Sequence, residues 1–372
     1  MSKKSFGIAG GSIVVVIITA VYMITASGSK SKSSSSPAGE DRVLKNAYND
    51  YFSIGAAING HTIEGPDSIL LMKHFNSVTP ENALKPGPVH PEEGTYSWGR
   101  ADRIVNFALR HQMRIHGHVL VWHEQAADWM FTTGGRPATK EELLGRMKEH
   151  IFTVVQRYKG KIGAWDVVNE AVADNGPDIF RHNIWYDICG EDYVKQAFIY
   201  AHEADPQAKL YYNDYNIIRP DKRERAYELL KSLLYEGVQV DGVGIQGHWS
   251  IYEPSEKELR DAITRFSSLG LDVQITELDM SVYKWEKDRR DKRVGESDDL
   301  TPGREAQQVA QYDMIFKTLR DYKDKIDAVT LWGVTDRSSW LNYSPVRGRK
   351  NYPLLFDREG KPKKAFYKVV DF

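Results

Sequence analysis

Two short runs of the sequence combine apolar, β-branched residues with a terminal glutamate. The runs are Ala164-Trp-Asp-Val-Val-Asn-Glu170 and Val273-Gln-Ile-Thr-Glu277. Runs of this kind are typical of strands that are covered on both faces in a parallel sheet. A carboxylate at the C-terminal end of such a strand lies where α/β barrels place their functional residues. The pattern therefore predicts a parallel α/β sheet with both glutamates at its functional edge.

Eight apolar runs of this kind alternate with helical patterns: Phe52–Ala57, Asn76–Thr79, Arg114–Val121, Ala164–Val168, Lys209–Asn213, Val243–Gln246, Leu271–Thr276 and Ala328–Trp332. This alternation predicts an α/β fold of the (β/α)8 TIM barrel type. A doubly wound open sheet is the alternative. It is disfavoured because no glycine-rich phosphate loop follows the first strand. In addition, polar residues follow nearly every strand, whereas a doubly wound sheet gathers them at one switch point.

Capping signals and apolar stripes predict the helices between these runs. Thr139-Lys-Glu-Glu142 and Ser255-Glu-Lys-Glu258 are capping boxes, and Arg219-Pro220 suits the start of a third helix. Apolar residues at helical spacing follow each start, and a fourth stripe lies further along the chain: Leu144, Met147, Ile151, Val154 and Tyr158; Leu259, Ile263 and Phe266; Ala226, Leu229, Leu230 and Leu233; Val309, Tyr312, Phe316 and Leu319.

The charge and cysteine content exclude several classes of protein. The formal net charge of the 372 residues is −1, so no field draws the chain to nucleic acid or to an anionic membrane surface. Cys189 is the only cysteine, which excludes an internal disulfide and a cysteine metal cluster. Aromatic residues make up 11% of the chain, which suits stacking against flat ligands such as sugar rings and equally suits an ordinary hydrophobic core. The chain is expected to be a monomer.

The N-terminal part reads as a targeting segment. Two lysines precede a charge-free run from Phe6 to Ala26, and two more lysines follow it. The run could just span a bilayer, while its most apolar part, Ile13–Ile24, also has the length of a signal-peptide core. We expect residues 1–27 to be a signal peptide or signal anchor, 28–40 a Ser/Lys-rich flexible tether, and 41–372 the catalytic domain. The domain would then act outside the cytoplasm, either released or membrane-anchored.

Polar residues follow the other predicted strands as well. Glu81, Asn82 and Lys85 follow strand two and offer the donors and acceptors that sugar hydroxyls need. Trp332 and Trp340 flank the end of strand eight and could form apolar walls for a sugar. Together with two carboxylates at one barrel mouth, these residues favour hydrolysis of a glycosidic bond.

Histidines on strand three generate a rival hypothesis. His116 and His118 are two residues apart and share a strand face, which is metal-ligand spacing. A metallohydrolase would place zinc on this pair, with His248 or Asp336 completing the site. The alternative is that one histidine bonds a substrate or a catalytic carboxylate while the other packs against the barrel wall. A non-catalytic sugar-binding protein is a third possibility.

Seven motifs resemble the endo-1,4-β-xylanases of glycoside hydrolase family 10, from about Lys45 to Phe372. They are Thr-Pro-Glu-Asn at 79–82, Gly-His-x-Leu-x-Trp-His-x-Gln at 117–125, Trp-Asp-Val-Val-Asn-Glu at 165–170, Asn-Asp-Tyr-Asn at 213–216, Gly-Ile-Gln-Gly-His at 244–248, Ile-Thr-Glu-Leu-Asp at 275–279 and Tyr-Pro-Leu-Leu-Phe-Asp at 352–357. The resemblance implies hydrolysis of xylan and xylo-oligosaccharides by a retaining mechanism, without a metal or other cofactor.

The resemblance also implies a role for each matching position. Glu170 would be the acid/base and Glu277 the nucleophile. Asn169 would hold the 2-hydroxyl of the sugar under attack, and His248, fixed by Asp279, would bond the nucleophile. The other implied substrate-binding residues are Glu81, Asn82, Lys85, His118, Trp122, Tyr215, Gln246, Trp332 and Trp340.

Three departures from the family pattern concern the outer parts of the site. Ala127 stands where the family usually has proline, and Pro86 follows Lys85 where tryptophan is frequent. The stretch 284–305 is longer and more charged than usual, and we expect a solvated loop on the rim. These departures leave the chemistry unaffected but bear on outer subsites and chain-length preference.

Overall fold

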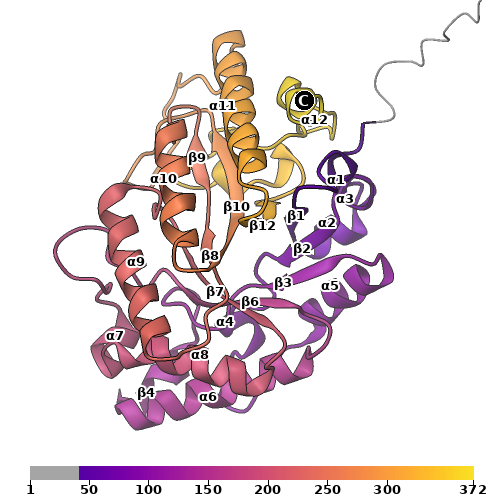
Figure 1. Cartoon of the computed structure of the whole chain (residues 1–372). Coiled ribbons are helices and arrows are strands. Elements are labelled where there is room, and N and C mark those ends of the chain that lie inside the picture. The colour runs from indigo at the N-terminus through magenta and orange to yellow at the C-terminus, as the bar shows by residue number, and fades with distance from the viewer. Residues whose placement is uncertain (1–41) are drawn as a thin grey trace, which may run out of the picture. The chain divides into compact units, whose positions relative to one another are not determined.

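The computed structural model describes residues 42–372, which form a closed barrel of parallel strands surrounded by helices (Figure 1). The predicted signal segment and tether lie outside the described residues. The predicted (β/α)8 barrel is confirmed. Its strands are β1 (Ser53–Ile58), β2 (Ser77–Pro80), β3 (Arg114–Gly117), β6 (Ala164–Asn169), β7 (Lys209–Asp214), β8 (Gly242–Ile245), β10 (Asp272–Ser281) and β12 (Ile326–Leu331).

The strands pair in chain order, and the last closes onto the first. Each neighbouring pair is parallel, and β12 pairs with both β1 and β10. A short strand, β9 (His248–Ser250), pairs with the end of β10. Two small two-stranded sheets lie outside the barrel: β4 (Thr132–Thr133) with β5 (Arg136–Pro137), and β11 (Arg290–Asp291) with β13 (Val346–Arg347).

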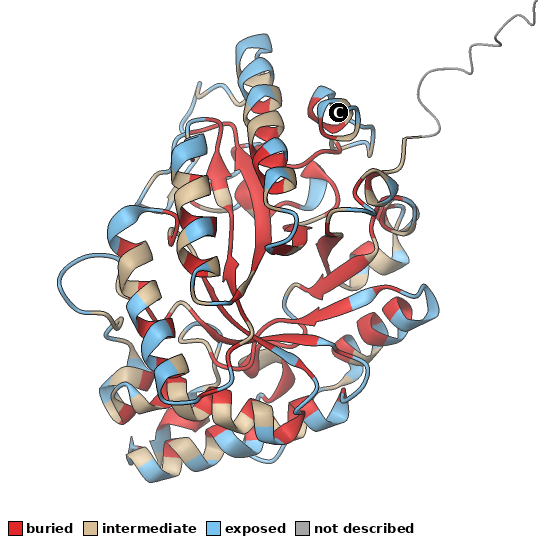
Figure 2. Cartoon of the chain, viewed as in Figure 1, coloured by how far each residue is buried: buried red, intermediate tan, exposed pale blue. Residues whose placement is uncertain are grey.

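Helices cover the outside of the barrel, so that the strands are buried on both faces (Figure 2). This explains why the strands read as continuous apolar runs. The helices are α1 (Leu44–Ala47), α2 (Gly60–Glu64), α3 (Asp67–His74), α4 (Pro86–Val89), α5 (Gly99–Arg110), α6 (Lys140–Arg157), α7 (Ile184–Cys189), α8 (Asp192–Ala204), α9 (Pro220–Tyr235), α10 (Glu256–Ser267), α11 (Pro302–Asp321) and α12 (Lys364–Val370). Single 3-10 turns occur at η1 (Asp128–Phe131), η2 (Asp336–Ser338) and η3 (Trp340–Asn342).

The predicted helix starts are confirmed. Thr139 and Ser255 each cap a helix with reciprocal bonds to the glutamate three residues later, and Pro220 begins α9. Within α6, Leu143 is buried where the stripe predicted Leu144, which is half-buried instead. No helix among residues 42–372 is long and apolar enough to cross a membrane.

Two predicted strands differ from the observed ones by more than two residues at one end. The predicted strand 114–121 ends at Gly117, so His118 and the residues after it lie in the connection that follows. The predicted strand 271–276 continues to Ser281, so Glu277 lies inside β10 and not at its end. The reason is β9: its pairing of His248 with Asp279 extends β10 beyond the barrel ladder, where the register with β12 shifts between Ile275 and Leu278.

Candidate active site

A cleft of about 1070 Å³ lies at the carboxyl ends of the barrel strands. Every catalytic or substrate-binding residue predicted from the sequence lines this cleft: Glu81, Asn82, Lys85, His118, Trp122, Asn169, Glu170, Tyr215, Gln246, His248, Glu277, Trp332 and Trp340. Asp279, predicted to fix His248, is buried beneath it. The cleft therefore gathers side chains that lie up to 259 residues apart in the 372-residue chain.

Glu170 follows β6 in a left-handed backbone conformation, with φ 58°. This conformation is costly for a residue with a side chain, by about 1–3 kcal/mol, and persists only where neighbours hold it. The Glu170 amide donates to the Asn213 carbonyl at 2.9 Å, and Arg181 Nε donates to the Glu170 carbonyl at 3.1 Å. The turn thus brings the Glu170 carboxyl into the cleft.

Three donors contact the Glu170 carboxyl. Trp122 Nε1 donates to Oε2 at 3.0 Å, while Gln246 Nε2 and Asn169 Nδ2 donate to Oε1 at 2.9 and 3.1 Å. Burial nevertheless raises the pKa of Glu170, and the charge of Asp214 adds to the rise more than that of Glu277. The group is therefore suited to carry a proton at pH values where an ordinary glutamate is ionised.

Glu277 is buried and receives two strong donors. His248 Nε2 contacts Oε2 at 3.1 Å, and Asn213 Nδ2 donates to Oε1 at 2.7 Å. Burial alone would raise the pKa of Glu277, but the His248 hydrogen bond, the charges of His118 and His248, and Asn213 bring it below its ordinary value. Glu277 is thus an ionised carboxylate at neutral pH.

A chain of amides connects the two carboxyl groups. The side-chain oxygen of Asn169, Oδ1, accepts from Gln246 Nε2 at 3.2 Å and from Asn213 Nδ2 at 2.9 Å. Gln246 also donates to Glu170, and Asn213 also donates to Glu277. Gly244 makes room for this arrangement, because a Cβ there would lie 2.3 Å from the Asn213 Oδ1. The two carboxyls are therefore held in one frame by residues from four neighbouring strands.

His248 is held between two carboxylates. Its Nδ1 lies 2.9 Å from Asp279 Oδ2, which also accepts from Trp340 Nε1 at 2.7 Å. Burial opposes protonation, but the charge and hydrogen bond of Asp279, together with Glu277, raise the pKa of His248 to about 10. An imidazolium beside Glu277 therefore keeps that carboxylate charged. Trp332 lies edge-on to His248 at 6.0 Å between ring centroids.

The residues after β2 form one end of the cleft. Lys85 Nζ donates to Asn82 Oδ1 at 2.9 Å and lies 4.9 Å from the centroid of the Trp122 ring. Burial lowers the pKa of Lys85. Glu81 accepts from Asn59 at 2.9 Å, which fixes its carboxylate. These pairs present fixed donors and acceptors to a ligand with several hydroxyl groups.

The four residues of the rival metal hypothesis are not brought together. His116 and His118 both bond the buried Asp166, each at 2.8 Å, and His248 bonds Glu277 and Asp279. Asp336 is fully buried against Lys363. Among residues 42–372, no group of three or more His, Cys, Asp or Glu side chains is arranged to hold a metal ion.

Asp166 explains the spacing of the two strand-three histidines. Burial alone would raise the pKa of Asp166, but His116 and His118 lower it to about 2. The prediction that one of these histidines bonds a substrate or a catalytic carboxylate while the other packs against the barrel wall missed this shared partner. Asp166 lies between two apolar residues of a buried strand. An isolated carboxylate in such a strand was the feature of the sequence that could have indicated a buried partner for the histidines.

The charged stretch 284–305 is more ordered than the prediction of a solvated loop implied. Arg290 and Arg349 share Glu286 and Glu296 in a network of bonds of 2.5–3.1 Å, and β11 pairs with β13. Trp285, Lys287 and Arg289 line the cleft. This stretch therefore shapes one rim of the site.

Comparisons with known proteins agree with this geometry. Residues 43–372 match the model of glycosyl hydrolase family 10. The chain is 49% identical over 329 residues to the beta-1,4-xylanase of Dictyoglomus thermophilum, covering 88% of this chain and 90% of that protein. It is 45% identical over 330 residues to the endo-1,4-beta-xylanase of Geobacillus stearothermophilus, covering 88% and 98%.

Solved structures give the same answer. Xylanase XynB from Paenibacillus barcinonensis, complexed with a conduramine derivative, superposes with a TM-score of 0.85 at 45% identity, covering 89% of this chain and 98% of that one. A mutant in complex with xylotriose gives 0.85 at 44%, covering 89% and 99%. The family predicted from the seven motifs is thus confirmed: the chain belongs to glycosyl hydrolase family 10.

Proposed function

We propose that this protein is an endo-1,4-β-xylanase that cleaves xylan and xylo-oligosaccharides with retention of configuration. The observation that carries the proposal is the pair of glutamates in one hydrogen-bonded frame with pKa values moved in opposite directions. Opposite shifts assign opposite tasks to two carboxyl groups. Glu170 is the acid/base and Glu277 is the nucleophile.

The reaction proceeds in two displacements. In the first, Glu277 attacks the anomeric carbon while Glu170 gives its proton to the departing glycosidic oxygen, so that a glycosyl ester forms and the leaving sugar departs as an alcohol. The ester no longer carries the Glu277 charge, so Glu170 is more readily ionised. In the second, Glu170 takes a proton from water, the water oxygen attacks the anomeric carbon, and the Glu277 carboxylate is released.

The surrounding residues position the sugar. Asn169 faces the 2-hydroxyl, and His248 keeps Glu277 ionised until the bond forms. The sugars on the non-reducing side contact the residues that follow β2, β3 and β12: Glu81, Asn82, Lys85, His118, Trp122, Trp332 and Trp340. The leaving sugar faces Tyr215 after β7, because that residue lies on the other side of Glu170 in the strand order.

The reaction outcome tests the proposal directly. Proton NMR in the first minutes of xylo-oligosaccharide hydrolysis should show the β-anomer at the new reducing end. An initial α-anomer would indicate inversion and exclude Glu277 as nucleophile. Chromatography of products from linear xylo-oligosaccharides should show internal cleavage.

Two simple measurements distinguish this function from a metallohydrolase and from a non-catalytic sugar-binding protein. A metallohydrolase would lose activity after dialysis against a strong chelator, whereas this mechanism predicts full activity. A non-catalytic sugar-binding protein would release no reducing ends from xylan. Activity that disappears with the chelator and returns with zinc would replace the proposal with the metal mechanism.

We also propose that the protein is exported and acts as a monomer. The support for export is the charge-free run Phe6–Ala26 behind two lysines, and a polymeric substrate that does not enter cells. Cell fractionation followed by N-terminal sequencing distinguishes a cleaved signal peptide from a retained anchor. Recovery of the full-length chain in the cytoplasm would exclude export. Light scattering measures the oligomeric state.

A further inference from the structure

Lys222 is a buried cation close to the leaving-group end of the cleft. It lies in the first turn of α9, and only 2% of its side chain is exposed. Its Nζ donates to Asp214 Oδ1 at 2.8 Å and to Asp174 Oδ1 at 2.9 Å. The ammonium also lies 3.6 Å from the centroid of the Tyr215 ring. The proposed reaction gives this group no role.

Asp214 connects Lys222 to the acid/base. It follows Asn213 at the end of β7, and the Asn213 carbonyl accepts the backbone amide of Glu170. Asp214 is fully buried, its second oxygen accepts from Tyr212, and burial raises its pKa although Lys222, Tyr212 and Arg181 work in the opposite direction. Its charge raises the pKa of Glu170 more than the charge of Glu277 does.

Asp174 connects the same lysine to the leaving-group surface. Tyr215 donates its hydroxyl to Asp174 Oδ2 at 2.7 Å, and Arg181 bonds both Tyr215 and the Glu170 carbonyl. Lys222 thus contacts a ring that faces the leaving sugar and a carboxylate that acts on the acid. Both contacts of Lys222 therefore involve groups that act in the same step of the reaction, the protonation and departure of the leaving sugar.

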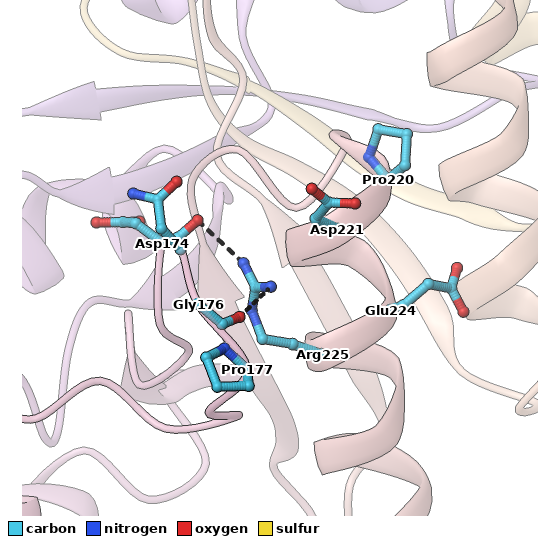
Figure 3. A pocket seen from close by; sticks show the side chains of 8 residues that line it. Asp174, Gly176, Pro177, Pro220, Asp221, Glu224 and Arg225 are labelled. Atoms are coloured by element: carbon cyan, nitrogen blue, oxygen red, sulfur yellow. Dashed lines mark hydrogen bonds between the residues drawn. The ribbon is translucent and has the colours of Figure 1, made fainter.

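The loop that carries Asp174 depends on α9 for its position. Figure 3 shows Arg225 of α9 reaching the backbone of this loop, where it donates to the carbonyls of Asp174 and Gly176 at 3.0 and 3.2 Å. A hollow of about 480 Å³ lies between the loop and the start of α9. The hollow leaves this side of the loop without packed neighbours. The hydrogen bonds from Arg225 of α9 therefore hold the loop in position there.

We propose that Lys222 is a positioning residue for the acid step, which keeps Asp214 charged behind Glu170 and holds Tyr215 against the leaving sugar. The proposal rests on the proposed function, in which Glu170 protonates the leaving group. The other charged and polar groups that face Glu170 come from every element packed around it: Lys85, Trp122, Asn169, Arg181, Gln246 and Glu277.

Removal of the Lys222 charge should lower the pKa of Glu170. Without Lys222, the buried Asp214 takes up a proton, and Glu170 loses the negative charge that, after burial, contributes most to its raised pKa. The alkaline limb of the pH–kcat/KM profile should therefore move to lower pH in Lys222→Met, by about half a unit or more. Asp214→Asn removes the same charge directly and should move the limb in the same direction.

The double variant tests whether both residues act through one interaction. In Lys222→Met/Asp214→Asn the alkaline limb should shift as far as in either single variant. The two shifts should not add, because both substitutions act on Glu170 through the charge of Asp214. It also leaves no unpaired charge between the two positions, so it decides the question if Lys222→Met fails to fold. An unmoved limb in the double variant overturns the proposal.

A substrate comparison separates positioning from simple stability. Hydrolysis of xylo-oligosaccharides needs the proton of Glu170, whereas an aryl xylobioside with a strongly acidic leaving group does not need it in the first step. At pH 7, Lys222→Met should lower kcat/KM about tenfold on xylo-oligosaccharides and less than about threefold on the aryl substrate. Equal losses on both substrates with an unmoved limb would assign Lys222 a structural role only.

Lys363 provides a matched control. It pairs with the fully buried Asp336 at 3.0 Å, its side chain is 7% exposed, and it does not line the cleft. Lys363→Met should leave both the limb and the ratio of the two substrates unchanged. Failure of the proposed function would be visible already in the wild type, as absent hydrolysis or inverted product, before any variant is compared.

Discussion

The surroundings of Glu277 and Glu170 differ in both structure and charge. Glu277 lies inside β10, where the register with β12 shifts, and receives donors from neighbouring strands, among them the imidazolium of His248. Glu170 lies in a left-handed turn after a strand, and after burial the charge that raises its pKa most is the carboxylate of Asp214. A cation therefore accompanies one glutamate and an anion the other.

This difference determines which of the two glutamates stays protonated. Two nearby carboxylates alone would raise the pKa of one of them without determining which one. Here His248 and Asn213 stabilise the ionised form of Glu277, while the charge of Asp214 raises the pKa of the buried Glu170 more than the charge of Glu277 does. The asymmetry is fixed by the residues around each glutamate and exists before substrate binds.

The largest expected effects come from removing the glutamates themselves. Glu277→Gln should lower kcat on every substrate by about 10⁴-fold or more, because no other group can form the glycosyl ester. Glu170→Ala should lower kcat/KM on xylan by about 10²–10⁴-fold and spare the first step with a strongly acidic leaving group. Burst kinetics with an activated aryl glycoside measures that step.

The comparison of the two glutamates fails if these variants behave alike. Equal loss in Glu170→Ala on xylan and on the activated glycoside would show that Glu170 is not the acid. Residual turnover of xylan by Glu277→Gln at more than about a hundredth of the wild-type rate would show that Glu277 is not the nucleophile. Circular dichroism of both variants verifies that the fold is intact.

The next effect concerns the cation beside Glu277. His248→Asn removes the group that lowers the pKa of Glu277, so that pKa should rise. Glu277 acts ionised, so the acidic limb of the pH–kcat/KM profile should move to higher pH, by about one unit. At the optimum, kcat should fall about 10–100-fold. The acidic limb of Lys222→Met serves as the control, since Lys222 acts on the alkaline side.

An acidic limb that does not move in His248→Asn would show that this limb does not report the ionisation of Glu277. It would then belong to another carboxylate, and the opposite environments of the two glutamates would have no measurable consequence. A shift of both limbs together would indicate that the two groups titrate as a coupled pair.

The fold could be predicted because local signals and tertiary structure agree. Alternating strands and helices, two capping boxes and Pro220 each mark a real element. The strand that was predicted too long, 114–121, stays apolar beyond Gly117 because Val119, Leu120 and Val121 are buried in the connection that follows. The extension of β10 depends on pairing with β9, which local sequence does not encode.

The cleft could be predicted through strand-end residues, whereas its buried support could not. Side chains at strand ends converge in any barrel, which explains why Trp122 and Trp340 share a cleft with Glu81. Lys222 lies on a helix among other charged residues, and the sequence around it is typical of a solvent-exposed helix surface. Only the structure shows that its side chain turns inward to Asp214.

The smallest expected effect concerns Trp340, whose ring belongs to the region around Glu277. A cellulose chain carries a hydroxymethyl group on every ring that xylan lacks, and a rigid indole wall would collide with it. Overpacking costs about 1–3 kcal/mol, so two adjacent subsites would disfavour glucan about a thousandfold. Trp340→Ala should narrow the ratio of kcat/KM on matched xylo- and cello-oligosaccharides by about tenfold.

Trp340 has a second role that the same experiment must separate. Its Nε1 donates to Asp279, which holds His248, so Trp340→Ala should also lower activity on both substrates. Trp340→Phe keeps most of the wall and loses the hydrogen bond. The phenylalanine variant should therefore lose activity on xylo- and cello-oligosaccharides alike and keep the wild-type ratio. A wild-type ratio near one, or a ratio unchanged in Trp340→Ala, would mean that Trp340 supports the nucleophile without selecting the sugar, and that the discrimination lies elsewhere along the cleft.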